Sequence, residues 1–286
     1  MKDIYIGRYA PTPETRDMKI YRFGDHKRNA YTILEDGTAE IRRFRENLYT
    51  LSIPEEIDGY RITRIREGAF RGHSSLHEVT IPEGVIRLGG QAFRECRGLH
   101  TVHLPESIEY IGIGAFRNDS WLLEINMPDG LMVIERWAFR DCERLRRITI
   151  PKQINEIKTY TFGGCKMLES VHLPEGLAAI GHGAFFLCYA LSKINLPKSL
   201  KRIENVAFYN CLGLTDLSLP DGVESIGSRV FGYCRNLKRI RIPESVREMG
   251  DGIFEGCDDL TVTVTEGSYA EDYCKRNGLS IHTITT

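Results

Sequence analysis

The sequence predicts an α/β repeat solenoid, in which short coils stack into one elongated domain. The prediction rests on three residue types that recur at a 23-residue step. A fixed period of this size is typical of stacked supersecondary units. The recurring residues are Pro82, Pro105, Pro128, Pro151, Pro174, Pro197, Pro220 and Pro243, preceded by Pro54; Phe70, Phe93, Phe116, Phe139, Phe162, Phe185, Phe208, Phe231 and Phe254; and Cys96, Cys142, Cys165, Cys188, Cys211, Cys234 and Cys257.

One repeat, taken from Leu99 to Leu122, contains two periodicities. Val102 and Leu104 alternate with polar residues, which is the period-two pattern of a strand with one buried face. Pro105 follows and removes a backbone donor, so it ends the strand. We expect the segment 115–122 to close the coil as a short helical turn. The sequence thus predicts about nine to ten curved coils with parallel strands on the concave face.

The cysteines are predicted to be free and buried. Seven of the eight occupy the same repeat position. Coils that stack at the spacing of neighbouring strands place such side chains in one column, all pointing the same way. A disulfide needs Cβ vectors turned toward each other. We therefore interpret these cysteines as small apolar core residues.

Both ends of the chain read as caps, which a solenoid needs to cover its terminal coils. Residues 1–50 form the N-terminal segment, with a hairpin indicated by Asp36-Gly37 between apolar runs. Residues 51–260 form the repeat array, and residues 57–60 are expected to bulge from it as a loop. Residues 261–286 form the C-terminal cap, where Ser268 and Glu271 predict a helix start and Ile281 lies in a final strand. All three parts are predicted to make one continuous structural domain.

Composition argues against several classes of partner. The formal net charge is −1 and the isoelectric point is about 6.7, so no general attraction to nucleic acid is expected. The longest apolar run, 184–191, is far shorter than a membrane span. Residues 1–26 carry no basic stretch followed by an apolar core, so we expect no secretory signal there.

The repeat resembles a known family. Its pattern, L-x-x-[IV]-x-[IL]-P-[EDK]-[GS]-[IVL]-x-x-[IL]-G-x-x-A-F-x-x-C, is similar to the Treponema-type leucine-rich repeat of BspA-like proteins and covers about residues 51–260. The resemblance implies a non-catalytic, surface-associated protein that adheres to host or bacterial proteins. Because no signal is visible, a cytoplasmic location also stays open.

The first candidate site is the outward face of the strands. Curved repeat proteins commonly bind partners there, and the charges on this face alternate in sign. A specific protein contact and an uncommitted solvated face both fit this pattern. The outward positions are Glu78, Thr80, Thr101, His103, Glu124, Asn126, Arg147, Thr149, Ser170, His172, Lys193, Asn195, Asp216, Ser218, Arg239 and Arg241.

Two further candidate patches follow the phenylalanine position. Stacked arginines repel one another unless negative charges neutralise them. We favour neutralisation within the protein by Glu95, Asp141 and Glu143 over binding of an anionic partner or acidic polysaccharide. Next to them lies an apolar edge, which predicts either a contact, including self-association, or partial burial under the next turn. The arginine column is Arg71, Arg94, Arg117 and Arg140, and the apolar edge is Phe186, Leu187, Tyr189, Tyr209, Leu212 and Tyr233.

The sequence offers little for catalysis. A filled solenoid lacks the dry, concave pocket that catalysis needs. His73, His77, His100 and His103 are the one group with metal-ligand chemistry, but we interpret His73 as a core substitute for cysteine and the others as surface residues. We therefore expect no enzyme activity, no cofactor and no metal.

The hypothesis from sequence is a scaffold that binds another protein or a polysaccharide. Adhesion or partner recognition is the form that the family resemblance implies. The alternative that the apolar edge motivates is a cytoplasmic scaffold that associates with itself, for example as a homodimer. A metal-binding or enzymatic protein is the least favoured hypothesis.

Overall fold

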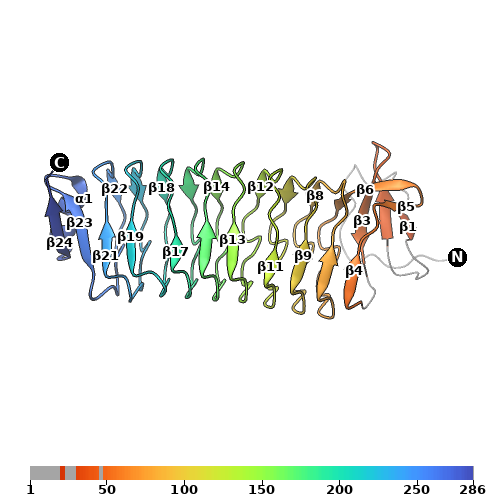
Figure 1. The fold of residues 1–286 in the computed structure, drawn as a ribbon, viewed down its shortest axis with the longest axis horizontal. Coiled ribbons are helices and arrows are strands. Elements are labelled where there is room, and N and C mark those ends of the chain that lie inside the picture. The colour runs from red at the N-terminus through yellow and green to blue at the C-terminus, as the bar shows by residue number, and fades with distance from the viewer. Residues whose placement is uncertain (1–19, 23–29, 45–47, 286) are drawn as a thin grey trace.

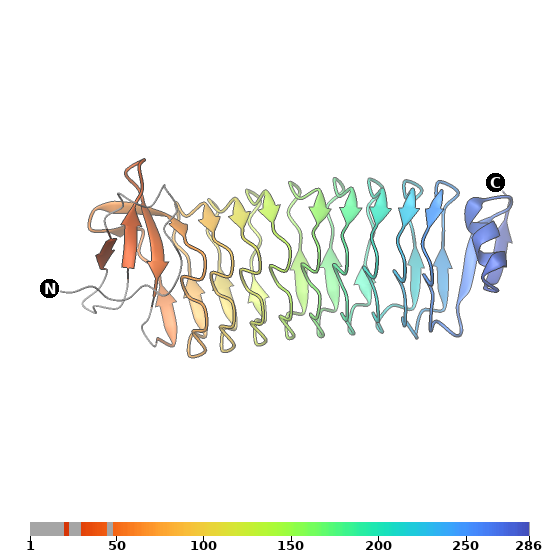
Figure 2. The same cartoon turned by 180° about the vertical axis from the view of Figure 1, so that it is seen from behind.

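The protein is an elongated solenoid. The computed structural model describes residues 20–22, 30–44 and 48–285, and Figures 1 and 2 show its coils side by side, with a hairpin at one end and a helix at the other. No helix in this described part is long and apolar enough to cross a bilayer.

One row of short parallel strands carries the predicted strand positions, and we call it the first row. Within each of its three sheets, a strand pairs with the strand of the next coil, so Thr101 lies opposite Glu124 and equivalent side chains form columns. Ten of its strands, β4 to β23, follow the repeat, at the upper end of the predicted count. The row contains β4 (Thr50–Ser52), β7 (Glu78–Thr80), β9 (Thr101–His103), β11 (Glu124–Ile125), β13 (Arg147–Thr149), β15 (Ser170–His172), β17 (Lys193–Ile194), β19 (Asp216–Ser218), β21 (Arg239–Arg241), β23 (Thr261–Thr265) and β24 (Ser280–Ile284).

A second row of strands runs through every coil, where the sequence indicated only inward-pointing isoleucines. Most of its members are two residues long, too short to show an alternating pattern. It contains β3 (Ala39–Arg43), β6 (Tyr60–Ile65), β8 (Arg87–Leu88), β10 (Tyr110–Ile111), β12 (Val133–Ile134), β14 (Glu156–Ile157), β16 (Ala179–Ile180), β18 (Arg202–Ile203), β20 (Ser225–Ile226) and β22 (Glu248–Met249).

The segments that close the coils are consecutive turns, so the predicted helical turn was wrong. Two residues per coil have left-handed backbone angles, for example Gly114 at φ 60° and Asn118 at φ 67°. Such residues interrupt a right-handed helix. The amides of the closing segments donate hydrogen bonds to the next coil instead: the amide of Phe116 donates to the carbonyl of Ala138 at 2.8 Å. The closing turns therefore form a third ladder along the stack.

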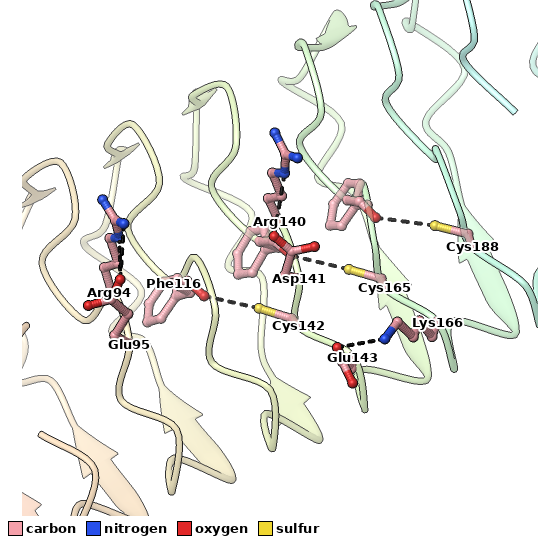
Figure 3. Close-up of polar contacts among 12 residues, drawn as sticks. Arg94, Glu95, Phe116, Arg140, Asp141, Cys142, Glu143, Cys165, Lys166 and Cys188 are labelled. Atoms are coloured by element: carbon pink, nitrogen blue, oxygen red, sulfur yellow. Dashed lines mark hydrogen bonds and ion pairs between the residues drawn. The ribbon is translucent and has the colours of Figure 1, made fainter. Parts of the chain in front are cut away.

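The core consists of the predicted phenylalanine and cysteine columns. Rings from Phe70 to Phe254 stack with centroids 4.8–5.8 Å apart and planes within 12°. All eight cysteines are buried and free, which confirms the prediction for the seven at the repeat position. Each of the seven repeat cysteines also donates its thiol to a phenylalanine carbonyl oxygen in the preceding coil; Cys142 reaches Phe116 at 3.1 Å, as Figure 3 shows.

Gly112 is required by close approach of two coils. A Cβ at this position would lie 2.5 Å from the backbone nitrogen of Gly90 and 2.6 Å from the carbonyl carbon of Gly89. Gly112 therefore lets β10 lie against β8.

The strand rows are interrupted at particular coils. The first row breaks after β11 and β17, and the second row breaks between β12 and β14. Both first-row breaks follow coils with asparagine at the last strand position, Asn126 and Asn195. The side chain of Asn126 bonds both backbone groups of Leu104, at 2.7 and 2.8 Å, where other coils use a backbone carbonyl. Both rows are interrupted between the coil of β11 and the coil of β13. In the described chain, the backbone hydrogen bonds that join these two coils therefore come from the closing turns.

The described parts of both ends contain the expected hairpin, helix and strand, whereas residues 1–19, 23–29 and 45–47 of the predicted N-terminal segment lie outside the described chain. At the start, β2 (Ala30–Ile33) and β3 form the antiparallel hairpin, and β1 (Ile20–Arg22) pairs with β2. The predicted loop is a tight hairpin between β5 (Glu56–Ile57) and β6. At the far end, α1 (Tyr269–Arg276) begins at Ser268, whose side chain accepts a hydrogen bond from the amide of Glu271. The predicted final strand is β24, which pairs with β23.

Candidate functional site

The outward side chains of the first row lie in register on one face. Most are exposed, and Thr101, Ser170 and Arg241 are half-buried. Several pair with a neighbour: His103 lies 3.0 Å from Glu78, and the guanidinium of Arg239 contacts Asp216. Arg147 and Lys193 have no ion-pair partner in the described chain, and they leave two cations available on this face.

The arginine column is mostly neutralised inside the protein. Arg94 lies 3.0 Å from Glu95, which also lies 3.6 Å from Arg71. Arg140 pairs with Asp141 at 3.4 Å, as Figure 3 shows. The neighbouring arginines hold the pKa of Glu95 below its usual range, against the opposing effect of burial. This geometry supports the internal interpretation of the column.

Two details of the column differ from the expectation. Glu143 contacts Lys166 at 2.8 Å instead of an arginine, because it lies two residues beyond the position of Asp141 and points along another column. Arg117 has no ion-pair partner among the described residues, and its buried Nε has no hydrogen-bond acceptor there. Its pKa is lowered by burial and by Arg140 and Arg94.

The apolar edge is a half-buried stack of rings. Phe186 stacks on Tyr209 at 5.3 Å, and Tyr209 contacts Tyr233 at 5.4 Å. Tyr160, which the sequence analysis did not include, meets Phe186 edge-on. Leu187, Tyr189 and Leu212 are also half-buried. The rings thus cover much of one another's surface, and a role of this edge in binding stays a prediction.

The four histidines do not converge on a common point. His73 packs against Phe44 and Phe70 at the cysteine position, whereas His77 and His100 stack with parallel rings 5.0 Å apart. His103 contacts Glu78. No cluster of metal-ligating side chains occurs in the described part of the chain.

Sequence reasoning missed a second ring stack, which lies where the closing turns lead into the first row. Tyr49 stacks on His77 at 3.8 Å, His100 follows, and Trp121 meets His100 at 5.4 Å. The guanidinium carbon of Arg144 lies 3.4 Å over the Trp121 ring. We call these five residues the Trp121 ladder. For Trp121 and Arg144, the signal in the sequence was a bulky residue at the repeat position that holds Gly98 and Gly213 in other coils.

The described surface has depressions but they are shallow. One of about 200 Å³ lies on the second row beside His182, Arg202 and Glu204. Another of about 410 Å³ lies between Asp221, Arg241 and Arg247. Both are open to solvent and lined by charged groups that the rest of the surface also carries, so neither has the enclosed, apolar form of a small-molecule site.

The fold and its repeat match a family of known proteins. The model of the BspA type leucine-rich repeat region, with six copies, matches residues 44–169 and 155–274. The chain belongs to the BspA-type leucine-rich repeat family. Membership implies, in general terms, a role in protein–protein interaction, and proteins built from these repeats are generally non-enzymatic. No curated protein matches the sequence.

Solved structures of leucine-rich repeat proteins resemble the chain. A leucine-rich repeat protein from Bacteroides ovatus is 26% identical, with a TM-score of 0.68 over 92% of this chain and 77% of that one. A leucine-rich cell surface protein from Faecalibacterium prausnitzii is 23% identical, with a TM-score of 0.58 over 94% and 95% of the two chains. The second likeness concerns the fold alone.

Proposed function

We propose that this BspA-type chain is a non-catalytic recognition module that binds another protein through the outward face of the first row. The observation that carries the proposal is the column geometry. Within each of the three sheets of the first row, parallel pairing in register holds outward side chains at fixed spacing, while the interior is filled by rings and thiols. Such a face is pre-organised, so little conformational entropy is lost when a partner binds.

The proposed setting is adhesion or partner recognition. The outward face combines charges of both signs with threonine, serine and asparagine. Charge patterns of this kind provide specificity and orient an approaching partner. The shallow depressions and the absence of converging nucleophiles, bases or metal ligands in the described residues support a non-catalytic role.

The proposal is tested by selecting binders from a random peptide library displayed on phage and measuring them on surface variants. Arg147→Glu and Lys193→Glu reverse two unpaired first-row charges. We expect each to weaken the selected peptides by about tenfold or more, which corresponds to about 1.4 kcal/mol. The measurement is the dissociation constant by biolayer interferometry.

Arg247→Glu is the matched control, because Arg247 is exposed beside the second row and has no ion-pair partner in the described chain. Its peptide affinity should stay unchanged. A library that yields no binder, or binders that respond to Arg247→Glu and not to the first-row reversals, would contradict the proposal.

A further inference from the structure

The Trp121 ladder is an exposed surface that fits a protein contact. Tyr49 and Trp121 are 67% and 42% exposed, and Leu123 and Met167 beside them are 36% and 39% exposed. Trp121, Arg144 and Met167 occupy the same repeat position in three successive coils, so they form one column. Tryptophan, tyrosine, arginine and methionine are the residues enriched at protein interfaces.

The same column changes character in the C-terminal half. The positions that follow Met167 are Ala190, Gly213, Asn236 and Asp259, and Asp259 is occupied by an ion pair with Lys238 at 2.7 Å. The bulky exposed side chains are therefore confined to the coils before β15. The C-terminal coils, with small or polar residues in the same column, therefore serve as an internal control for this surface.

The charges around the ladder favour an acidic partner. Its carboxylates are mostly engaged: Glu78 contacts His103, Glu143 contacts Lys166, and Glu169 contacts Arg146. The cations Arg97, Arg144 and Arg147 have no ion-pair partner in the described chain, against one such carboxylate, Glu124. The unneutralised charge of this surface is thus positive.

We propose that the Trp121 ladder is the docking site for an acidic, extended segment of another protein. Arg144 is held over the Trp121 ring by a cation–π contact, and its guanidinium can bind a carboxylate in a bidentate manner. The exposed ring edges, Leu123 and Met167 receive apolar side chains of the same segment. This inference rests on the proposed function and locates the partner within it.

A protein segment fits the ladder better than a sugar polymer. Sugar rings pack on open aromatic faces, but here His77 stacks on both Tyr49 and His100, and Arg144 lies over the Trp121 ring. The outer parts of the rings and the arginine remain open, and they suit mixed acidic and apolar side chains.

The test uses Trp121 as its own reporter. Trp137→Phe removes the other tryptophan of the chain, and the probe is a random copolymer of glutamate and tyrosine. We expect saturable quenching or a shift of Trp121 emission. Arg144→Ala in this background should weaken binding by about tenfold or more. Arg235→Ala, an exposed arginine in the polar half, should leave it unchanged.

Three outcomes of this test would overturn the inference. It is wrong if the copolymer does not change Trp121 emission, or if Arg144→Ala and Arg235→Ala bind equally. Heparin is the competing probe: equal or tighter binding of heparin would assign the surface to an anionic polysaccharide. If library peptides respond to the first-row reversals but not to Arg144→Ala, the proposed function stands and this inference fails.

Discussion

Phe162→Ala is expected to lower the free energy of unfolding by about 3–5 kcal/mol. Phe162 is fully buried at the middle of the stack, with Phe139 and Phe185 at 5.5 and 5.7 Å on its two sides. Removing the ring leaves a cavity that well-packed neighbours fill only in part. Denaturant unfolding followed by circular dichroism measures the loss.

Phe254→Ala is the control for position in the stack. Phe254 is 6% exposed and stacks on Phe231 alone among the ring contacts of the described chain. We expect its loss to be smaller than that of Phe162→Ala. A loss below about 1 kcal/mol for Phe162→Ala would mean that the ring column is not the main core.

Asp119→Cys is expected to stabilise the protein by about 1–3 kcal/mol at about pH 8, because it removes a buried polar atom without a partner. Asp119 is fully buried at the cysteine position of its coil. One carboxyl oxygen accepts the amide of Cys96 at 2.8 Å, and the other has no partner in the described chain. By the repeat, a thiol here would donate to the carbonyl of Phe93.

The same site gives stability a defined pH dependence. Burial raises the pKa of Asp119 well above its ordinary value of 3.8, so the folded state binds this proton more tightly than the unfolded state. At pH values below the pKa of Asp119 in the unfolded chain, the carboxyl is protonated in both states and the folded protein has its full stability. Part of this stability is lost as pH rises toward the folded pKa, at up to about 1.4 kcal/mol per pH unit.

Asp119→Asn isolates this contribution because its amide cannot ionise. The free energy of unfolding of Asp119→Asn minus that of the unchanged protein should increase between about pH 5 and pH 8. Denaturant unfolding at both pH values measures it. A difference that does not change with pH would mean that Asp119 has the same protonation in the folded and unfolded states.

Much of the fold was predictable because every coil repeats the same buried positions. The phenylalanine and cysteine columns, the first row and both caps follow from residues whose spacing is visible in the chain. The closing turns were not predictable in the same way. Left-handed angles at Trp137, Tyr160 and Val206 occur at residue types that rarely adopt them. The residue types at these positions therefore did not indicate a turn.

The candidate surfaces were predicted less completely, for a physical reason. Outward first-row positions follow from alternation, and the neutralisation of Arg94 and Arg140 follows from nearby acids. The Trp121 ladder depends on rings from four coils, with Tyr49 outside the regular spacing. Such contacts depend on side-chain direction across coils, which periodicity alone does not specify.

Hydrogen exchange of the whole chain, with and without a peptide selected from the library, tests the central claim most directly. We expect added protection in the first-row strands β7, β9, β11 and β13 and in residues 119–124, which lead from the Trp121 ladder into the first row. Protection confined to the second row, β8 to β22, or to the stacked rings from Phe186 to Tyr233, would contradict the account.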